Sequence, residues 1–338
     1  MNDSKEFHSL VLPTPDFTHG EAAYCPFPTV TSAFYHHASY LASAKAVRDL
    51  SGDSVTELTY HELAVEAQHL ATRLRRLGVR PHQSIPLVVK RGAEMIIGIM
   101  AILSCGAQYV PLDGGVVPDS TIQHVADQCG GQIVLCLSST EARIKDLLPR
   151  MTAIVIERET ILNRSLDNPD TWINLASSEA GCYIIYTSGS SRLAPKRKAS
   201  APLDLDESLD VLICTPTILS KYHPKSYPNI KVVATAGEPT SQGLADLWAT
   251  HATYWNCCGP TETTIVNTMS RHVAGQAVSI GRPTPNNSVY ILDGDGKPVP
   301  VGVAGIMWAG GHGVSRGYVG LESKTKEAYV LDPFANDG

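Results

Sequence analysis

Short apolar runs of strand length alternate along this chain with segments of helical period. A helical segment begins after Thr59 and places Leu63, Ala67 and Leu70 on one stripe before Gly78, and the apolar run 84–89 follows it. The same alternation returns after residue 205. Because strands that are joined through helices lie parallel and are covered on both faces, this pattern predicts an α/β protein with mostly parallel sheets.

Boundary residues sharpen these expectations. Thr59 and Glu62 have the spacing of a capping box, which predicts that the helix starts at residue 60. We expect further helices over 93–105, 118–129, 216–221 and 241–249, and strands over 84–89, 107–112, 132–137, 153–156, 211–214, 231–235 and 253–255. Short β runs at 288–292 and 305–309, with glycine and proline turns, predict a β-rich end.

Composition divides the chain into five expected parts. Residues 1–28 indicate an irregular tail, 29–191 a first α/β part, 192–208 a linker, 209–275 a second α/β part and 276–338 a β-rich part. The linker is basic, then acidic, and has no apolar period, as is typical of an exposed connection.

Bulk properties exclude several classes of protein. The 338 residues are 43% hydrophobic and 18% charged, which is enough for substantial cores. Lys and Arg number 27 against 33 Asp and Glu, and the absence of a basic block argues against nucleic-acid binding. Residues 95–112 carry no charge and approach the length of a membrane span, but Gly98, Gly106 and Pro111 favour a buried helix followed by a strand.

The eight cysteines show no C-x-x-C spacing, and the N-terminus has no apolar signal segment. Neither zinc binding nor a disulfide framework is therefore indicated. We expect reduced, buried thiols in a cytoplasmic protein without a membrane span.

Two loops at strand ends are candidates for chemistry. Thr187-Ser188-Gly189-Ser190-Ser191 offers hydroxyl donors, and its glycine allows backbone N–H groups to approach a phosphate. Gly259-Pro260-Thr261-Glu262 presents a hydroxyl and a carboxylate that suit a phosphate and a Mg²⁺ ion. Ordinary turns explain both segments as well, and the Walker pattern is absent.

A set of motifs in fixed order carries a family resemblance. The chain resembles the adenylate-forming, AMP-binding enzymes, most closely the adenylation domains of nonribosomal peptide synthetases. The motifs are Leu58-Thr59-Tyr60-His61-Glu62-Leu63, Leu103–Asp113, Tyr186–Ser191, Ala236-Gly237-Glu238-Pro239, Asn256–Glu262, Gly281-Arg282-Pro283 and Gly310–Tyr318. The resemblance implies the large N-terminal region of that fold, with two α/β subdomains, a partial β-rich subdomain and no small C-terminal subdomain.

The resemblance also implies a reaction and its cofactors. ATP and Mg²⁺ would activate an amino acid as its aminoacyl-adenylate with release of pyrophosphate, in nonribosomal peptide or related secondary-metabolite synthesis. The ATP phosphates would be contacted by Thr187, Ser188, Gly189 and Ser190, and the adenine by Gly237, Glu238, Pro239 and Cys258, the last standing where the family usually has an aromatic ring. Thr261 would touch the α-phosphate and Glu262 would hold Mg²⁺.

Five small or apolar residues align with part of the family's amino-acid pocket, and ordinary core packing would explain them equally well. They are Ala234, Ala236, Cys257, Ile265 and Val266. The substrate would be an amino acid or another carboxylic acid, and a carrier protein could be supplied in trans.

This sequence also departs from the family pattern. Only residues 190–210 stand where the family has a long α/β stretch before Thr215-Pro216-Thr217, and Arg192 replaces a loop glycine. The chain ends at Gly338, before the family's C-terminal subdomain. We therefore expect weak or absent catalysis by this chain alone. The alternatives are a non-catalytic remnant or interaction module from a degenerate or mis-spliced synthetase gene, and a stand-alone acyl or aryl acid ligase.

Overall fold

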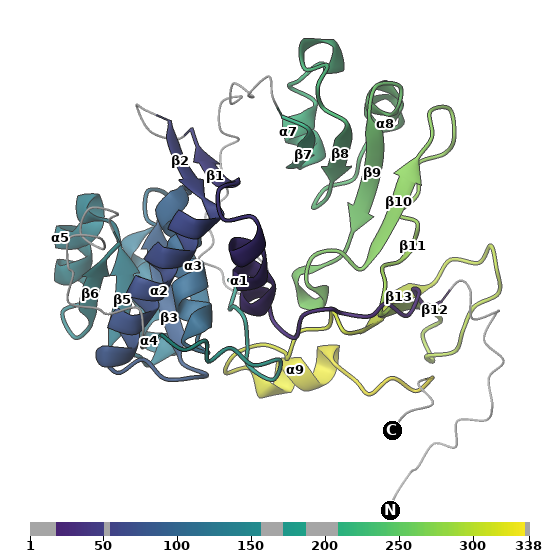
Figure 1. The fold of residues 1–338 in the computed structure, drawn as a ribbon. Coiled ribbons are helices and arrows are strands. Elements are labelled where there is room, and N and C mark those ends of the chain that lie inside the picture. Colours follow the sequence, from purple (N-terminus) through teal and green to yellow (C-terminus); the bar gives the residue numbers. More distant parts are fainter. Residues whose placement is uncertain (1–17, 51–54, 157–171, 187–208, 335–338) are drawn as a thin grey trace, which may run out of the picture. The chain divides into compact units, whose positions relative to one another are not determined.

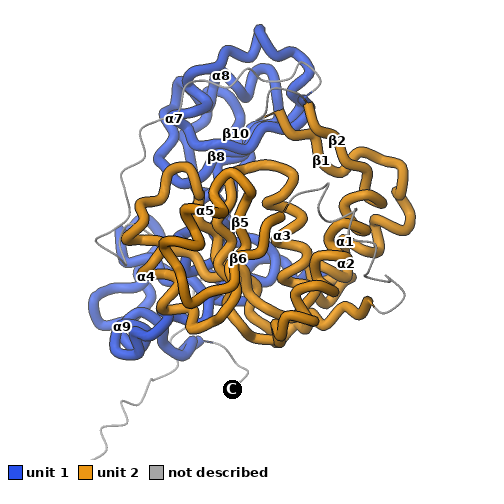
Figure 2. Tube along the Cα trace, turned by 90° about the vertical axis from the view of Figure 1, so that its left-hand side faces the viewer, with its two compact units in different colours: residues 1–24, 197–338 blue, residues 25–196 orange. Residues whose placement is uncertain are grey.

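A computed structural model describes residues 18–50, 55–156, 172–186 and 209–334 (Figure 1). The chain forms two compact units, one of residues 25–196 and one of residues 1–24 with 197–338 (Figure 2). We refer to them as the N-terminal unit and the C-terminal unit. Among the described residues, no helix is long and apolar enough to cross a membrane, and residues 95–112 are divided between a helix and a strand.

The N-terminal unit is built on a four-stranded parallel sheet. Its strand order is β4-β3-β5-β6, and all neighbouring strands run parallel. The strands are β3 (Ser84–Val89), β4 (Gln108–Asp113), β5 (Ile133–Cys136) and β6 (Thr152–Val155). The parallel sheet that the alternating pattern predicts is therefore confirmed in this unit.

Helices cover both faces of this sheet. α2 (Tyr60–Arg76) and α3 (Ala93–Ser104) form one hydrophobic cluster with Leu87. α4 (Asp119–Cys129) and α5 (Ser138–Leu147) form a second cluster with Val88. Since successive side chains of a strand point to opposite faces, the neighbouring residues Leu87 and Val88 separate the two cores.

The capping box at Thr59 is confirmed. The Glu62 backbone N–H donates to Thr59 Oγ1 at 3.2 Å, and the Thr59 backbone N–H donates to Glu62 Oε2 at 2.8 Å. Two donors at the start of α2 are satisfied in this way. The helix ends at Arg76, and Gly78 follows with φ +98°, a conformation that glycine adopts without strain.

Several elements of this unit were not predicted. α1 (Val30–Tyr40) carries polar and aromatic residues without a clear apolar stripe. β1 (Lys45–Asp49) and β2 (Thr56–Thr59) form a short antiparallel pair, in which Lys45 lies 2.8 Å from Glu57. α5 was missed as well. These short segments depend on pairing and packing rather than on a periodic pattern of their own.

The C-terminal unit contains a five-stranded mixed sheet of order β11-β10-β9-β8-β7. β7 (Val211–Cys214), β8 (Val232–Thr235) and β9 (Thr253–Cys258) run parallel, while β10 (Thr268–His272) and β11 (Arg282–Pro283) are antiparallel. α7 (Pro216–Leu219), η3 (Pro224–Ser226) and α8 (Gln242–Ala249) complete this part. Trp248 of α8 is fully buried against Leu212, Val233 and Tyr254, so α8 covers one face of the sheet.

One strand boundary needs correction. The sequence places the end of β9 at Trp255, whereas the strand continues to Cys258. The reason is β10, which was not predicted and which pairs with β9 from Tyr254 to Cys258. Residues 256–258, the first part of the Asn256–Glu262 motif, therefore lie in a strand.

The β-rich end contains the two expected strands. β12 (Asn287–Leu292) and β13 (Ile306–Gly311) pair along their full length. Within the segment expected to be an irregular tail, His19 forms an isolated bridge with Ser288 of β12. α9 (Glu322–Ala328) follows β13 and was not predicted.

All eight cysteines carry free thiols and lie among the described residues. Cys105 and Cys136 are buried, and burial raises the pKa of Cys105 to about 12 and that of Cys136 to about 11. Cys25 and Cys182 are exposed, so the expectation of buried thiols is wrong for these two.

Gly281, at the start of the Gly281-Arg282-Pro283 motif, lies where the backbone packs too closely against Met269 for a larger residue. Gly281 and Gly275 have φ of +78° and +82°, but an added Cβ would lie 2.0 Å from the Met269 carbonyl oxygen at Gly281 and would meet nothing within 4 Å at Gly275. Alanine costs about 1–3 kcal/mol in this conformation, and overpacking adds about 1–3 kcal/mol at Gly281 alone. In urea denaturation, Gly281→Ala should therefore be clearly less stable than Gly275→Ala, and equal midpoints would contradict this packing.

Candidate functional site

Three loops meet at one edge of the C-terminal unit's sheet. Because β7, β8 and β9 are parallel, their carboxyl ends lie at the same edge, where ligands bind in open α/β sheets. The segments that follow them contain Thr217, Glu238 and Glu262. The structure therefore brings the expected adenine segment and the expected Mg²⁺ ligand to one edge. Thr187, Ser188, Gly189 and Ser190 lie outside the described residues.

The segment Gly237-Glu238-Pro239 is exposed and fixed to the loop after β7. Thr217 donates to Glu238 Oε2 through its backbone N–H at 3.1 Å and its hydroxyl at 2.5 Å. The hydroxyl bond is the main reason that the pKa of Glu238 lies below its ordinary value of 4.5. Gly237 has φ +83°, which lets the chain turn directly after β8.

Glu262 lies in the short helix η4 (Thr261–Thr263), directly after the Gly259-Pro260 turn. A Cβ on Gly259 would lie 2.7 Å from the Asn267 backbone nitrogen, so only glycine allows this close approach of the two chain segments. The Tyr318 hydroxyl donates to Glu262 Oε1 at 2.7 Å. This bond raises the pKa of Tyr318 to about 12, so the phenol stays protonated and remains a donor near neutral pH.

The donor set at Glu262 fits magnesium. Within the described part of the chain, no group of three His, Cys, Asp or Glu side chains is placed to hold a metal ion. Mg²⁺ is commonly held by one or two carboxylates together with water and substrate phosphates. The Glu262 carboxylate therefore suits a metal that arrives with a nucleotide, because the described residues do not form a site made of protein ligands alone.

The five residues of the expected substrate pocket are only partly brought together. Ala234 pairs with Trp255 in the parallel register, so Ala234 and Cys257 lie on the same face of the sheet. Cys258 lies on the other face, which it shares with Tyr254 and which α8 covers. Ile265 is 56% exposed, and Ala236 and Val266 are half-buried in the following loops.

A cavity in this unit lies away from the expected site. Its volume is about 300 Å³, and it is lined by Pro224, Tyr227 and Trp248 among others. Of the residues expected to bind nucleotide, metal or acid, none that the structure describes lines this cavity. The candidate site is therefore the open edge of the sheet and not this cavity.

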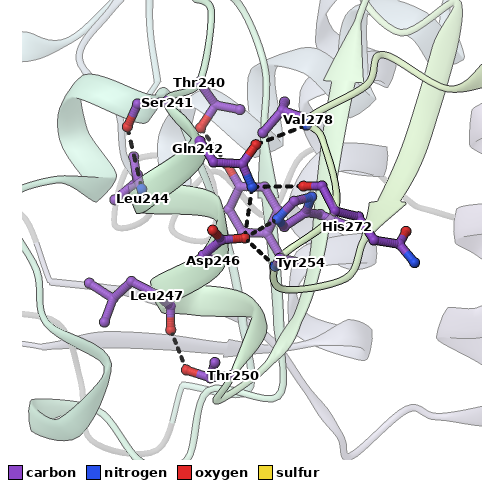
Figure 3. Close-up of polar contacts among 12 residues, drawn as sticks. Thr240, Ser241, Gln242, Leu244, Asp246, Leu247, Thr250, Tyr254, His272 and Val278 are labelled. Carbon is purple, nitrogen blue, oxygen red and sulfur yellow. Dashed lines mark hydrogen bonds and ion pairs between the residues drawn. The ribbon is translucent and has the colours of Figure 1, made fainter.

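The sequence does not predict a polar network that joins α8 to β10 (Figure 3). Asp246 Oδ1 accepts hydrogen bonds from Gln242 Nε2 at 2.9 Å, from the Gly275 backbone N–H at 2.9 Å and from His272 Nε2 at 2.7 Å. The His272 side chain is only 3% exposed. The i, i+4 spacing of Gln242 and Asp246 is a signal that could have been read, whereas His272 is distant in sequence.

Tyr254 connects the expected adenine segment to β9 (Figure 3). Its hydroxyl lies 2.8 Å from Thr240 Oγ1, as Figure 3 shows. It also lies 2.7 Å from Thr235 Oγ1. Thr240 directly follows Pro239, and α8 starts two residues later. The network therefore holds the loop after β8, α8 and the strands β9 and β10 in one arrangement.

The Asp246 network should make stability depend on pH. Hydrogen bonds, first from Gln242 and then from His272, lower the pKa of Asp246 from 3.8 to about 2. A carboxyl group whose pKa is lowered in the folded protein stabilises the fold at pH values above its ordinary pKa. This contribution disappears as the pH falls from about 4 to about 2. In urea denaturation, Asp246→Asn should be less stable than the wild type near neutral pH, with a gap that closes through this range. A gap that persists at pH 2 would contradict this origin.

The sequence matches a family model and resembles parts of longer known proteins. The family model described as "AMP-binding enzyme" matches residues 34–191 and 197–319. The chain is 35% identical over 380 residues to adenylate-forming reductase 06235 of Coprinopsis cinerea, covering 96% of this chain and 36% of that protein. It is 27% identical over 345 residues to nonribosomal peptide synthetase 5 of Aspergillus fumigatus, covering 86% of this chain and 15% of that protein.

Two further findings concern length and fold. The chain spans about a third of the length of the first curated relatives. The alignment of 380 residues exceeds this chain's 338, so the fungal reductase carries residues inside the aligned region that this chain lacks. Among solved structures, the nonribosomal peptide synthetase FmoA3 bound to alpha-methyl-L-serine-AMP has a TM-score of 0.80 at 20% identity, covering 93% of this chain and 42% of that one.

Proposed function

Because the chain belongs to the AMP-binding enzyme family, we propose that it binds ATP and activates a carboxylic acid as its adenylate. The observation that carries the proposal is that Glu238 and Glu262 both follow the carboxyl ends of parallel strands. They stand in the segments that resemble the family's nucleotide motifs. The adenine would lie along Gly237, Glu238 and Pro239, beside Cys258. The phosphates would be contacted by Thr261 and by the loop of Thr187, Ser188, Gly189 and Ser190.

The proposed reaction is a transfer at phosphorus. An oxygen of the acid's carboxylate forms a bond to the α-phosphorus of ATP, and the bond from that phosphorus to the bridging oxygen breaks, so that pyrophosphate leaves. Mg²⁺, held by Glu262 together with phosphate oxygens and water, would supply positive charge where negative charge develops. The chain's own residues would contribute by orienting the nucleotide. The bond from Thr217 to Glu238, for example, fixes the loop along which the adenine would lie.

We propose an amino acid as the substrate class, with aryl and aliphatic acids as the competing classes. Support comes from the likeness to a nonribosomal peptide synthetase. The residues Ala234, Ala236, Cys257, Ile265 and Val266 would form part of a small, apolar pocket for the acid. The likeness to a fungal adenylate-forming reductase supports adenylation without deciding the acid. The acyl group would pass to a carrier protein supplied in trans, within the cytoplasm.

A second candidate is a protein that binds nucleotide without completing adenylation. The longer fungal relative favours it, because this chain lacks residues within the aligned region. On the edge strand β7, Ile213 is 75% exposed and Val211 is 48% exposed, so the described residues leave apolar surface uncovered there. Such a surface is typical of a fold from which covering elements are missing.

ATP–pyrophosphate exchange separates the two candidates. The purified chain is incubated with ATP, Mg²⁺, labelled pyrophosphate and pools of amino, aryl or aliphatic acids. Acid-dependent exchange supports adenylation, and the stimulating pool identifies the substrate class. Binding of ATP without exchange supports the second candidate. A folded chain that neither binds ATP nor exchanges pyrophosphate would overturn both.

A further inference from the structure

A tyrosine far along the chain holds the carboxylate proposed to bind magnesium. The Tyr318 hydroxyl donates to Glu262 Oε1 at 2.7 Å, across 56 positions of sequence. The Ser315 backbone N–H donates to the Glu262 carbonyl oxygen at 2.7 Å. Both the side chain and the backbone of Glu262 are therefore attached to the segment between β13 and α9.

Tyr318 is itself held in place from two sides. Its backbone N–H donates to Thr325 Oγ1 of α9 at 2.9 Å. Its ring meets the ring of Tyr329 edge-on, with centroids 5.7 Å apart, and the Tyr329 hydroxyl lies 2.7 Å from Ser315 Oγ. A hydroxyl carried by a fixed ring can orient its acceptor, because little rotational freedom remains to be lost.

The loop that carries Glu262 needs such anchors. Thr264 and Ile265 have φ of +55° and +63°, which non-glycine residues rarely adopt and which costs about 1–3 kcal/mol each. The Thr264 hydroxyl donates to the Gly313 carbonyl oxygen at 2.6 Å, and the Gly313 N–H donates to Asn287 Oδ1 at 2.8 Å. The β13–α9 segment thus contacts this loop at Glu262 and at Thr264.

We propose that Tyr318 is a positioning residue for magnesium: its hydroxyl holds Glu262 Oε1 and thereby fixes the plane in which the carboxylate meets the cation. The inference rests on the proposed function of Glu262. Mg²⁺ requires near-ideal octahedral geometry, and a carboxylate that rotates without this bond meets that requirement less often. Groups that orient metal ligands typically contribute about 10–100-fold in metal affinity or activity.

The test compares Tyr318→Phe with Tyr290→Phe. Tyr290 also donates to a carboxylate, Asp332 Oδ2 at 2.9 Å, so the control removes the same kind of bond elsewhere in the unit. One measurement is the Mg²⁺ concentration that gives half-maximal pyrophosphate exchange, together with the rate at saturating Mg²⁺. The other is calorimetric binding of Mn²⁺ in the presence of the α,β-methylene analogue of ATP, which cannot transfer its adenylyl group to the acid.

Tyr318→Phe should raise the half-maximal Mg²⁺ concentration and the Mn²⁺ dissociation constant by about 10–100-fold, with a smaller loss of rate at saturating metal. Tyr290→Phe should leave both values near those of the wild type. If the wild type binds metal with the analogue and Tyr318→Phe binds it equally well, the inference is wrong while the proposed function stands. If the wild type itself binds no metal with the analogue, the proposed function of Glu262 fails and the inference fails with it.

Discussion

Replacement of Glu262 by glutamine is expected to lower ATP–pyrophosphate exchange by about 10²–10³-fold, the usual effect of removing one group that stabilises charge in a transition state. The substitution keeps the shape of the side chain and a hydrogen-bond acceptor for Tyr318, but it removes the negative charge that Mg²⁺ requires. The loss should therefore reflect the metal and not the fold.

Glu322 provides the matched control. It is an exposed glutamate in the first turn of α9, and Glu322→Gln makes the same chemical change outside the segments expected to bind nucleotide or metal. Exchange by Glu322→Gln should stay close to that of the wild type. If Glu262→Gln also retained wild-type exchange at low Mg²⁺, the assignment of Glu262 as the magnesium ligand would be wrong.

Helices such as α2 and α3 and strands such as β3 and β7 could be predicted because their signals are local. The capping residues Thr59 and Glu62 determine the start of α2 within four positions of sequence. β3 and β7 have the bounds that their apolar runs predict. In each case the physical cause, a cap or a buried run between turns, lies within the segment itself.

Elements that depend on distant partners could not be predicted in this way. β10 contains Thr268, Ser270 and Arg271, which lack an apolar pattern, and it exists as a strand through pairing with β9. His19 joins β12 across most of the chain. Pairing between distant segments leaves little trace in the local sequence, because a polar strand such as β10 is stabilised by backbone hydrogen bonds that any residue but proline can make.

The same distinction applies to the candidate site. Glu238 and Glu262 could be named from the sequence because each stands in a recognisable short motif. Tyr318 also stands in a motif, yet nothing local indicates that its hydroxyl contacts Glu262. Sequence patterns thus identify the groups that would meet a ligand more readily than the groups that orient them.

Replacement of Trp248 by alanine is expected to destabilise the C-terminal unit by about 3–5 kcal/mol. Trp248 is fully buried and packs with Leu212, Val233 and Tyr254 between α8 and the sheet, so alanine would leave a large cavity. No other side chain of α8 among the described residues fills this space to a similar extent, since Ala245 is its other buried residue.

Trp248→Phe is the control that separates the effect of lost side-chain volume from the effect of the buried indole N–H. The indole Nε1 of Trp248 is buried and has no hydrogen-bond partner among the described residues. Phenylalanine keeps most of the ring and removes this unpaired donor, whose burial costs about 1–3 kcal/mol, so the loss of volume should be partly offset. Trp248→Phe should therefore be much closer to the wild type in stability than Trp248→Ala.

Hydrogen exchange resolved along the chain measures both effects and locates them. In Trp248→Ala, amides of β7, β8 and β9 should lose protection while those of β3 and β5 keep it, because the two sheets belong to separate compact units with separate cores. Equal protection of β8 in the alanine and phenylalanine variants would show that Trp248 does not fill the core as its burial indicates. Loss of protection in β3 to the same degree as in β8 would show instead that the two units unfold together.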